Sequence, residues 1–284
     1  MSEPILPDDD EKKINEPILS DSAKVTLASN IRFPITAIVL AAGLSRRMGK
    51  QNKLLLPIGK QKLIAKTVDV VLASQVEETL VVLGHEAIKL QRVLRGKNIT
   101  LLKNSLYQLG MTTSIQRGVQ AASKNTKAYI VVLGDLAQIE ASTRNVLIEA
   151  FNVASQNEQT PRVIPTCEGK RGNPVIFSSH FKEVILQHQD MNGCKGIVQA
   201  NSQHVVTVEM PNNQVLKDID TLEDYKEWKL TVVEEEKKRE ELQEVDISEE
   251  KNEVKEGIIE EEKATATEEL EDSVLSSESN LEGE

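Results

Sequence analysis

The residues with the clearest chemical potential lie in one short loop, residues 40–49, of sequence LAAGLSRRMG. Small residues open the loop, Ser45, Arg46 and Arg47 follow, and Lys53 stands a few positions later. Small residues allow a base or a phosphate to approach the backbone, and backbone amides with clustered cations neutralise a polyphosphate. The loop therefore predicts a site for a nucleoside triphosphate, with a solvated basic turn as the alternative.

Two common phosphate-binding motifs do not match this loop. Five residues separate Gly43 from Gly49, where a P-loop has four, and Gln51 follows Lys50 where a P-loop has Ser or Thr. The dinucleotide-binding fingerprint needs a second glycine two positions after the first, and Ser45 stands there instead. The loop is therefore a phosphate-binding candidate of another type.

Short apolar runs alternate with helical patterns on both sides of the loop, and they predict the elements that position it. Such alternation is typical of a Rossmann-like α/β fold, a mostly parallel sheet with helices on both faces. Ligands of such sheets bind beyond the carboxyl ends of the strands, where the loop after Leu40 and the pair Gly134-Asp135 would meet. After Pro161 the pattern loosens, which fits either an added lobe or an antiparallel extension of the same sheet. The expected strands are 36–40, 79–83, 99–102, 128–133, 175–177 and 205–209, and the expected helices are 63–73, 87–94, 113–122 and 143–154.

Charge and composition divide the chain into three parts. Residues 231–284 hold 21 Asp and Glu against 6 Lys and Arg, a charge of −15, so residues 1–230 carry +4 of the chain's net −11. The acidic segment has too few apolar side chains to offset its ordering entropy, and we expect a disordered tail. Residues 1–33, in which Glu-Pro-Ile-Leu occurs twice, are expected to be a disordered leader. Residues 34–230 are the expected folded domain.

Composition also excludes several classes of protein. The sequence has no run of about 18 apolar residues and no signal-peptide core, so we expect a cytoplasmic protein without a membrane span. Aromatic residues make up 3% of the chain and no dense basic stripe is present, which argues against nucleic-acid binding. Cys167 and Cys194 lack the spacing of a zinc site or a disulfide framework, and we expect two reduced thiols.

The motifs, taken in order, resemble the MobA-like nucleotidyltransferase superfamily and, within it, the molybdenum cofactor cytidylyltransferases. The resemblance runs from about residue 36 to residue 228 and begins with Leu-Ala-Ala-Gly-x-Ser-x-Arg-Met-Gly, followed by Lys53 and three leucines. Isoprenoid and sugar nucleotidyltransferases have a similar first loop, so this loop alone does not distinguish the families. The later motifs, in their order along the chain, favour the cytidylyltransferases. These motifs are NSLYQLG at 104–110 with Ser114 after it, GD at 134–135, RGNPV at 171–175, DIDT at 218–221 and EDY at 223–225.

The resemblance implies a sheet of the nucleotide-diphospho-sugar transferase type, a nucleotidyltransferase domain over residues 34–230, and a role for each matching residue. The implied reaction transfers CMP from CTP to the terminal phosphate of molybdopterin, with Mg²⁺ as cofactor and pyrophosphate as product. Alanine at position 42, where guanylyltransferase relatives carry glycine, favours CTP over GTP. Arg47, Lys53 and Asp135 are the implied catalytic residues. The implied nucleotide site is Leu40, Ala41, Ala42, Gly43, Ser45, Arg47 and Lys53, the acceptor site is Asn104, Ser114 and Asn173, and the metal site is Asp135 and Asp220.

Two positions depart from the pattern of the relatives and leave other functions open. Ala137 and Asn173 stand where cytidylyltransferase relatives have proline and histidine. The alternatives are a nucleotidyltransferase with another base or phosphorylated acceptor, and a non-catalytic module that presents a cofactor to a molybdoenzyme client. The acidic residues also have a structural alternative, because Asp135, and likewise Asp218 and Asp220, could instead cap a following helix.

Overall fold

A computed structural model describes residues 31–232 except Lys50, 158–159, 201–203 and Asp220. Of these, residues up to 226 belong to one compact unit, and residues 227–232 belong to a second unit and are helical. The expected leader and tail lie outside the described residues apart from 31–33 and 231–232. Within the described part of the chain, no helix combines the length and apolar character that crossing a membrane requires.

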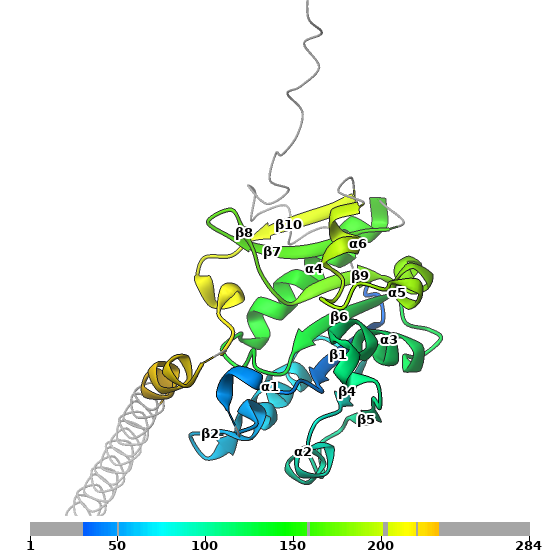
Figure 1. The fold of residues 1–284 in the computed structure, drawn as a ribbon. Helices are drawn as coiled ribbons and strands as arrows, with labels where there is room; N and C mark the ends of the chain where they lie inside the picture. Colours follow the sequence, from blue (N-terminus) through cyan, green and yellow to red (C-terminus); the bar gives the residue numbers. More distant parts are fainter. Residues whose placement is uncertain (1–30, 50, 158–159, 201–203, 220, 233–284) are drawn as a thin grey trace, which may run out of the picture. The chain divides into compact units, whose positions relative to one another are not determined.

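An eight-stranded, mostly parallel sheet forms the centre of the domain (Figure 1). The predicted strands at 36–40, 79–83 and 128–133 are buried almost throughout, as is usual for parallel strands covered by helices on both faces, whereas those at 99–102 and 205–209 are partly exposed. The region after Pro161 extends this same sheet and is not a separate lobe. In spatial order the strands are β10 (Val205–Glu209), β7 (Arg162–Cys167), β9 (Val175–Ser178), β6 (Ala128–Leu133), β1 (Ile35–Ala41), β4 (Glu78–Leu83) and β5 (Thr100–Lys103), with β8 (Lys170–Arg171) beside β7.

Parallel pairing joins the central strands that end at the two predicted loops. β1 runs parallel to β6 and to β4, with Leu40 opposite Leu133 in the β1–β6 register. β9 runs antiparallel between β6 and β7. The loop after β1 and the loop after β6 therefore leave the sheet side by side at the same edge.

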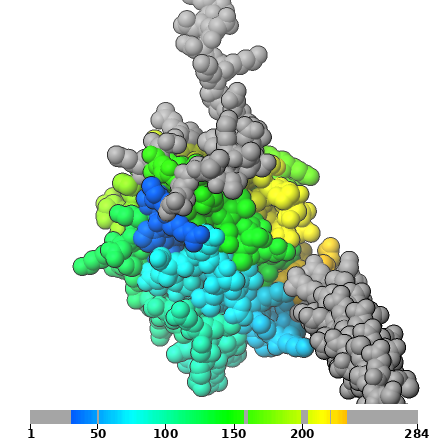
Figure 2. Space-filling view, turned by 180° about the vertical axis from the view of Figure 1, so that it is seen from behind, coloured from blue at the N-terminus to red at the C-terminus, as the bar shows by residue number. Residues whose placement is uncertain are grey.

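Helices cover both faces of the sheet, as predicted. The helices are α1 (Leu63–Leu72), α2 (Ala87–Val93), α3 (Met111–Ala121), α4 (Ala141–Asn157), α5 (Lys182–Gln187) and α6 (Lys195–Ala200). Apolar residues of α3, α5 and α6 form one core with Ile38, Leu80 and Tyr129. On the other face α1 packs against β1 and α4, and the surfaces of α1 (cyan) and α4 (green) adjoin in the view from behind (Figure 2). The fold is thus a layered α/β domain of the expected type.

Some elements were not predicted, for identifiable reasons. Pro165 lies inside β7 and interrupts the apolar run that would otherwise predict a strand, since proline is disfavoured in sheet interiors. β7 pairs with β9 only at Arg162 and Val163, so this proline lies beyond that ladder. The hairpin of β2 (Pro57–Ile58) and β3 (Gln61–Lys62) is too short to give a pattern. Several ends also differ, and α4 extends beyond its predicted 143–154 at both ends.

The buried thiol of Cys194 gives the domain a pH dependence that can be measured. Burial in the core beside α6 raises the pKa of Cys194 from 9.0 to about 12. The folded thiol therefore keeps its proton at pH values where the unfolded thiol loses it, so this contribution to stability is present below pH 9 and is lost between pH 9 and about 12. The slope of this loss is about 1.4 kcal/mol per pH unit.

We expect the free energy of unfolding of Cys194→Ala to fall less steeply above pH 9 than that of the wild type. Urea denaturation at several pH values between 7 and about 10.5 measures both slopes. Ionisation of Cys167 contributes equally to the two proteins and cancels in the comparison. Identical slopes would show that the Cys194 thiol is not protected from ionisation in the folded state.

Candidate active site

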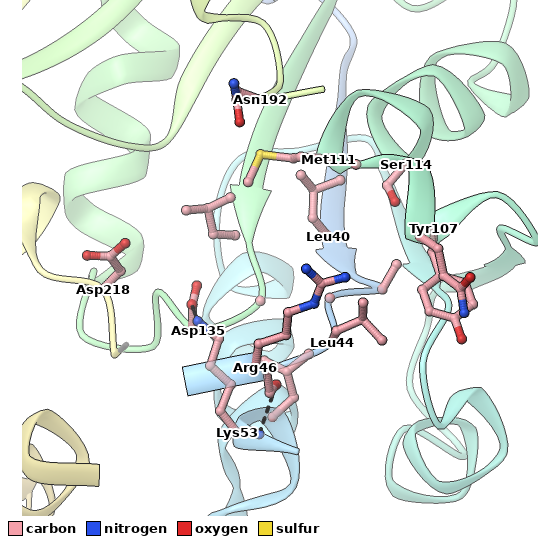
Figure 3. A pocket seen from close by; sticks show the side chains of 18 of the residues that line it. Leu40, Leu44, Arg46, Lys53, Tyr107, Met111, Ser114, Asp135, Asn192 and Asp218 are labelled. Atoms are coloured by element: carbon pink, nitrogen blue, oxygen red, sulfur yellow. Dashed lines mark hydrogen bonds and ion pairs between the residues drawn. The ribbon is translucent and has the colours of Figure 1, made fainter. Parts of the chain in front are cut away.

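A cleft of about 490 Å³ opens where β1 and β6 end (Figure 3). A volume of this order suits a small-molecule ligand. Its lining comes from segments far apart in the sequence, which the parallel sheet brings to one edge. The cleft is lined by residues 40, 42–46, 53–54, 107–108, 110–111, 114, 133–135, 191–192 and 218.

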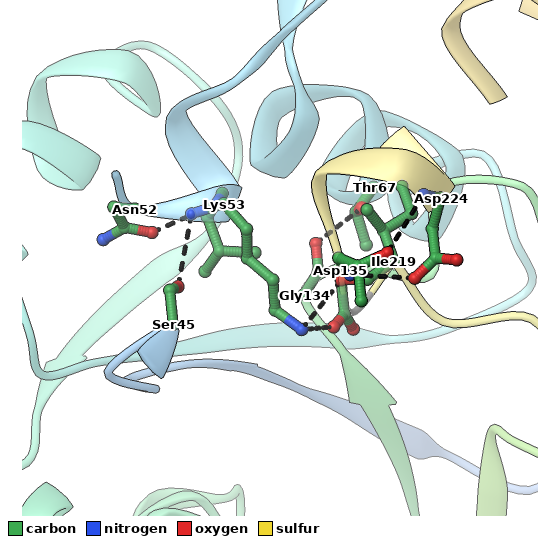
Figure 4. Close-up of polar contacts among 10 residues, drawn as sticks. Ser45, Asn52, Lys53, Thr67, Gly134, Asp135, Ile219 and Asp224 are labelled. Atoms are coloured by element: carbon green, nitrogen blue, oxygen red, sulfur yellow. Dashed lines mark hydrogen bonds and ion pairs between the residues drawn. The ribbon is translucent and has the colours of Figure 1, made fainter. Parts of the chain in front are cut away.

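The loop after β1 is folded so that Lys53 turns back into the cleft. Ser45 adopts a left-handed backbone conformation with φ of 50°, which costs a non-glycine residue about 1 kcal/mol. Its Oγ accepts a hydrogen bond of 3.2 Å from the backbone N–H of Lys53, and Asn52 caps the short helical turn there through a 3.1 Å bond from Leu54 N (Figure 4). At Gly43 a Cβ atom would meet nothing within 4 Å, so this face of the loop is open.

Lys53 joins the first loop to two other segments of the cleft. Its Nζ forms an ion pair with Asp135 Oδ2 and donates a 3.1 Å hydrogen bond to the carbonyl oxygen of Ile219 (Figure 4). The Asp135 side chain is 8% exposed, so its charge lies largely out of water and needs a cationic partner. α4 begins only at Ala141, so Asp135 does not cap that helix.

The backbone just before Asp135 is held from both sides. Gly134 N donates a 3.0 Å hydrogen bond to Leu40 O of β1. Gly134 O accepts a 2.8 Å bond from the hydroxyl of Thr67, a buried residue of α1. These bonds fix the point where the chain leaves β6, and with it the position of the Asp135 carboxylate.

Asn104 supports the opposite wall without lining the cleft. Its side-chain amide donates 3.0 Å hydrogen bonds to Thr113 Oγ1 and Ser114 Oγ, and its Oδ1 accepts a 2.9 Å bond from Leu106 N. The predicted acceptor residues Asn104 and Ser114 are therefore in contact, but of the two it is Ser114 that faces the cleft. Asn104 ties the end of β5 to the start of α3 and orients the Ser114 hydroxyl.

Tyr107 and Ala42 both pack closely against Gly84 at this wall. Gly84, at the end of β4, lies between them, and a Cβ atom there would be 2.7 Å from Tyr107 Cβ and 2.8 Å from Ala42 Cβ. The absence of a side chain at position 84 lets both residues keep these positions in the lining of the cleft.

Two methionines and an asparagine complete the cleft at its far side. Met111 N donates a 3.0 Å hydrogen bond to Met191 O, which joins the start of α3 to the segment between α5 and α6. Met191 is 63% exposed and Asn192 follows it in the lining. Thioether side chains are polarisable and adapt to flat apolar ligands.

Several predicted site residues lie together in the cleft, and others lie elsewhere. Ala41 is buried beneath the loop, and in the lining Arg46 stands where Arg47 was expected. Asn173 lies outside the lining, before a cis peptide bond to Pro174, and its N–H donates a 2.9 Å bond to Val215 O. The ligand-binding roles stay predictions. The predicted residues that line the cleft are Leu40, Ala42, Gly43, Ser45, Lys53, Ser114 and Asp135.

Asp218 is not needed as a helix cap. Thr221 and Asp224 cap the helix that begins at residue 222, with Asp224 N donating to Thr221 Oγ1 at 3.1 Å and Thr221 N donating to Asp224 Oδ2 at 2.8 Å. Asp218 instead lines the cleft. Asp220, predicted as a metal ligand, lies outside the described residues.

The donor set of the cleft consists of carboxylate oxygens, which suit hard divalent cations such as Mg²⁺ and Mn²⁺. Among the described residues no three His, Cys, Asp or Glu side chains gather as a metal cage. Mg²⁺ typically takes one or two carboxylates and completes its shell with water and substrate phosphates. Asp135, with Asp218 in the same lining, supplies carboxylates of this kind.

Comparison with known proteins links these features to one family and one fold. The model of the MobA-like NTP transferase domain matches residues 37–206. Molybdenum cofactor cytidylyltransferase of Escherichia coli (strain K12) is 25% identical over 192 residues, which cover 67% of this chain and 93% of that protein. Bifunctional protein GlmU of Listeria innocua is 32% identical over 114 residues, which cover 40% of this chain but 24% of GlmU.

Solved structures of nucleotidyltransferases share the fold at lower identity. A nucleotidyl transferase from Methanothermobacter thermautotroptrophicus superposes with a TM-score of 0.62 at 22% identity, covering 71% of this chain and 98% of that one. CMP:2-keto-3-deoxy-manno-octonic acid synthetase, solved with CTP, gives a TM-score of 0.57 at 11% identity and covers 71% of this chain and 99% of its own. The nucleotide-diphospho-sugar transferase fold is therefore shared well beyond sequence likeness.

Proposed function

Because this chain belongs to the MobA-like NTP transferase family, we propose that its cleft transfers CMP from CTP to the terminal phosphate of molybdopterin. The observation that carries the proposal is the contact between Lys53 and Asp135, which joins the small-residue loop to a strand-end carboxylate inside the cleft. In this position the cation of Lys53 can bind triphosphate oxygens, and the carboxylate of Asp135 can bind the metal ion that accompanies the triphosphate. The similarity to molybdenum cofactor cytidylyltransferase supports the choice of acceptor.

The reaction proposed is an in-line displacement at the α-phosphorus of CTP. An oxygen of the acceptor phosphate forms the new bond to phosphorus, the bond to the β-phosphate oxygen breaks, and pyrophosphate leaves. The protein has little covalent work to do, so positioning and charge neutralisation carry the rate enhancement.

Each proposed role follows from where a side chain lies. Lys53, 20% exposed, can turn from Asp135 toward phosphate oxygens, and Arg46 in the same lining adds a second cation. Asp135 would hold Mg²⁺, with Asp218 or Asp220 as the second carboxylate. When bound, Mg²⁺ neutralises charge that develops on the phosphate oxygens. Arg47 and Asn173 keep supporting roles only as predictions.

The walls of the cleft support the choice of substrates. Ala42 and Tyr107 both line the cleft beside Gly84, and the methyl group of Ala42 takes up space that a purine would need more than a pyrimidine. Met111, Met191 and Asn192 on the far side offer polarisable and amide groups to a flat heterocycle such as a pterin. A molybdoenzyme client and a cytoplasmic location stay predictions.

A pyrophosphate-release assay with CTP, GTP, ATP and UTP, each with and without molybdopterin, tests the proposed function. We expect release only with CTP and molybdopterin together. Release with another nucleotide or another phosphorylated acceptor would replace the proposed substrates. Binding without release from any combination would favour the cofactor-presenting module.

The methyl group of Ala42 is expected to set the preference for CTP. Ala42→Gly removes a carbon atom next to Tyr107 and widens the cleft there, so GTP should gain about tenfold in kcat/KM relative to CTP. Steady-state kinetics with both nucleotides measure the ratio. Thermal unfolding of the variant provides the control for folding, and an unchanged ratio would place base selection elsewhere.

A further inference from the structure

Arg144 is a buried arginine directly behind the loop that carries Asp135. It belongs to the first turns of α4 and is 1% exposed. Among the described residues it forms no ion pair, and burial lowers the pKa of its guanidinium to about 10. Burying a charged group is costly unless hydrogen bonds compensate for the lost water.

The hydrogen bonds that Nη1 and Nη2 of Arg144 donate go to the backbone that follows Asp135. Nη1 donates to Ile139 O at 2.6 Å, and Nη2 donates to Leu136 O at 3.2 Å. Leu136 and Ile139 are themselves buried, so without the guanidinium these two carbonyl groups would lose their partners away from water. The planar fork of arginine can serve two acceptors at fixed positions, which a lysine ammonium cannot do as well.

These bonds complete the anchoring of the Asp135 loop. Gly134, on one side of Asp135, is held by Leu40 and Thr67. On the other side, the chain between Asp135 and α4 has no regular secondary structure, and Arg144 holds it at two carbonyl groups. Leu136 N also donates a 3.1 Å hydrogen bond to Leu133 O, so removal of Arg144 would loosen the side of Asp135 that leads to α4 without releasing it, while the Gly134 side stays fixed.

We propose that Arg144 is a positioning residue, which holds Asp135 where its carboxylate can bind a divalent cation. This inference rests on the proposed function, because it assumes that Asp135 is a metal ligand. Residues that orient metal ligands from behind typically change metal affinity by about 10- to 100-fold when they are removed.

The chain contains a matched control in Arg162. This arginine is 0% exposed, Nη1 donates a 2.8 Å hydrogen bond to Ile197 O, and the guanidinium lies over the ring of Phe181. It stands at the start of β7, where it pairs with Phe177, which in turn pairs with Tyr129 near the start of β6. Arg162 is thus a buried arginine at the opposite edge of the sheet from Asp135.

The experiment compares Arg144→Met with Arg162→Met in the full chain. Both should lower the free energy of unfolding, because each removes a buried hydrogen-bonded side chain. Only Arg144→Met should weaken Mn²⁺ binding, measured by electron paramagnetic resonance in the presence of CTP, by about tenfold or more. Only Arg144→Met should also speed amide hydrogen exchange in residues 134–140.

A second variant keeps the inference testable if Arg144→Met does not fold. Arg144→Lys keeps the charge but replaces the planar fork with a single ammonium nitrogen, and it should show the same two changes to a smaller degree. Equal losses of Mn²⁺ affinity in the Arg144 and Arg162 variants, or unchanged exchange at 134–140 in the Arg144 variants, would overturn the inference. Failure of the proposed function is distinguishable, because it shows in the wild type itself as a lack of Mn²⁺ binding and of pyrophosphate release.

Discussion

Asp135→Asn is expected to reduce pyrophosphate release by about 10³-fold while the domain stays folded. The amide has nearly the shape of the carboxylate and can still accept the hydrogen bond from Lys53, but it lacks the charge that binds Mg²⁺. Lys53 is partly exposed and can reach water when its charged partner is lost, so the effect on folding should be small. Turnover number and thermal unfolding of the same preparation measure the two effects.

Asp69→Asn is the matched control for this prediction. Asp69 in α1 also forms an ion pair with a lysine, Lys97, and neither residue lines the cleft. Its loss should leave turnover at the wild-type level. If Asp135→Asn retained its activity, the proposed metal role of Asp135 would be wrong.

Lys53→Met is expected to change turnover and metal affinity in opposite directions. Loss of the cation that neutralises the triphosphate should lower kcat by about 10²-fold or more. The ammonium group of Lys53 also forms an ion pair with the Asp135 carboxylate in the absence of ligand, so a divalent cation must displace this ammonium group in order to bind. Without nucleotide, Mn²⁺ should therefore bind Lys53→Met more tightly than the wild type. If the Lys53 ammonium and the metal ion repel each other by about 1.4 kcal/mol, the gain in affinity is about tenfold.

Mn²⁺ titration without nucleotide, followed by single-turnover kinetics with CTP, measures both effects of Lys53→Met. Lys97→Met provides the control, because it removes a lysine of the same kind from the pair with Asp69. A parallel fall of metal affinity and turnover would show instead that Lys53 holds Asp135 in place.

The sequence predicts the centre of the site because local patterns determine it. The buried runs of β1 and β6 are short and apolar, each ends in a glycine-bearing loop, and parallel strands place such ends at one edge of the sheet. For this reason the meeting of the first loop with Asp135 could be predicted without coordinates. The sheet order beyond β6 could not, because Pro165 hides β7.

The far wall of the cleft could not be predicted, because long-range contacts form it. Met191 and Asn192 reach the cleft through the hydrogen bond of Met191 O with Met111, some eighty positions earlier in the chain. No motif or periodicity in residues 188–194 predicts this hydrogen bond. Likewise, Arg46 lines the cleft although Arg47 was predicted to bind the nucleotide. Which of the two arginines faces the cleft depends on the orientation of one short helical turn, and the sequence pattern does not determine that orientation.

The two glycines at 43 and 84 are constrained in different ways. Gly84 does not line the cleft itself, yet any side chain there would collide with Tyr107 and Ala42 even in the ligand-free protein. Gly43 has free space around it, so the protein alone would accept alanine and only a bound ligand could demand glycine. Among relatives that use other substrates, we therefore expect glycine to stay at position 84 as long as this packing persists. Position 43 should instead vary with the ligand that each relative binds.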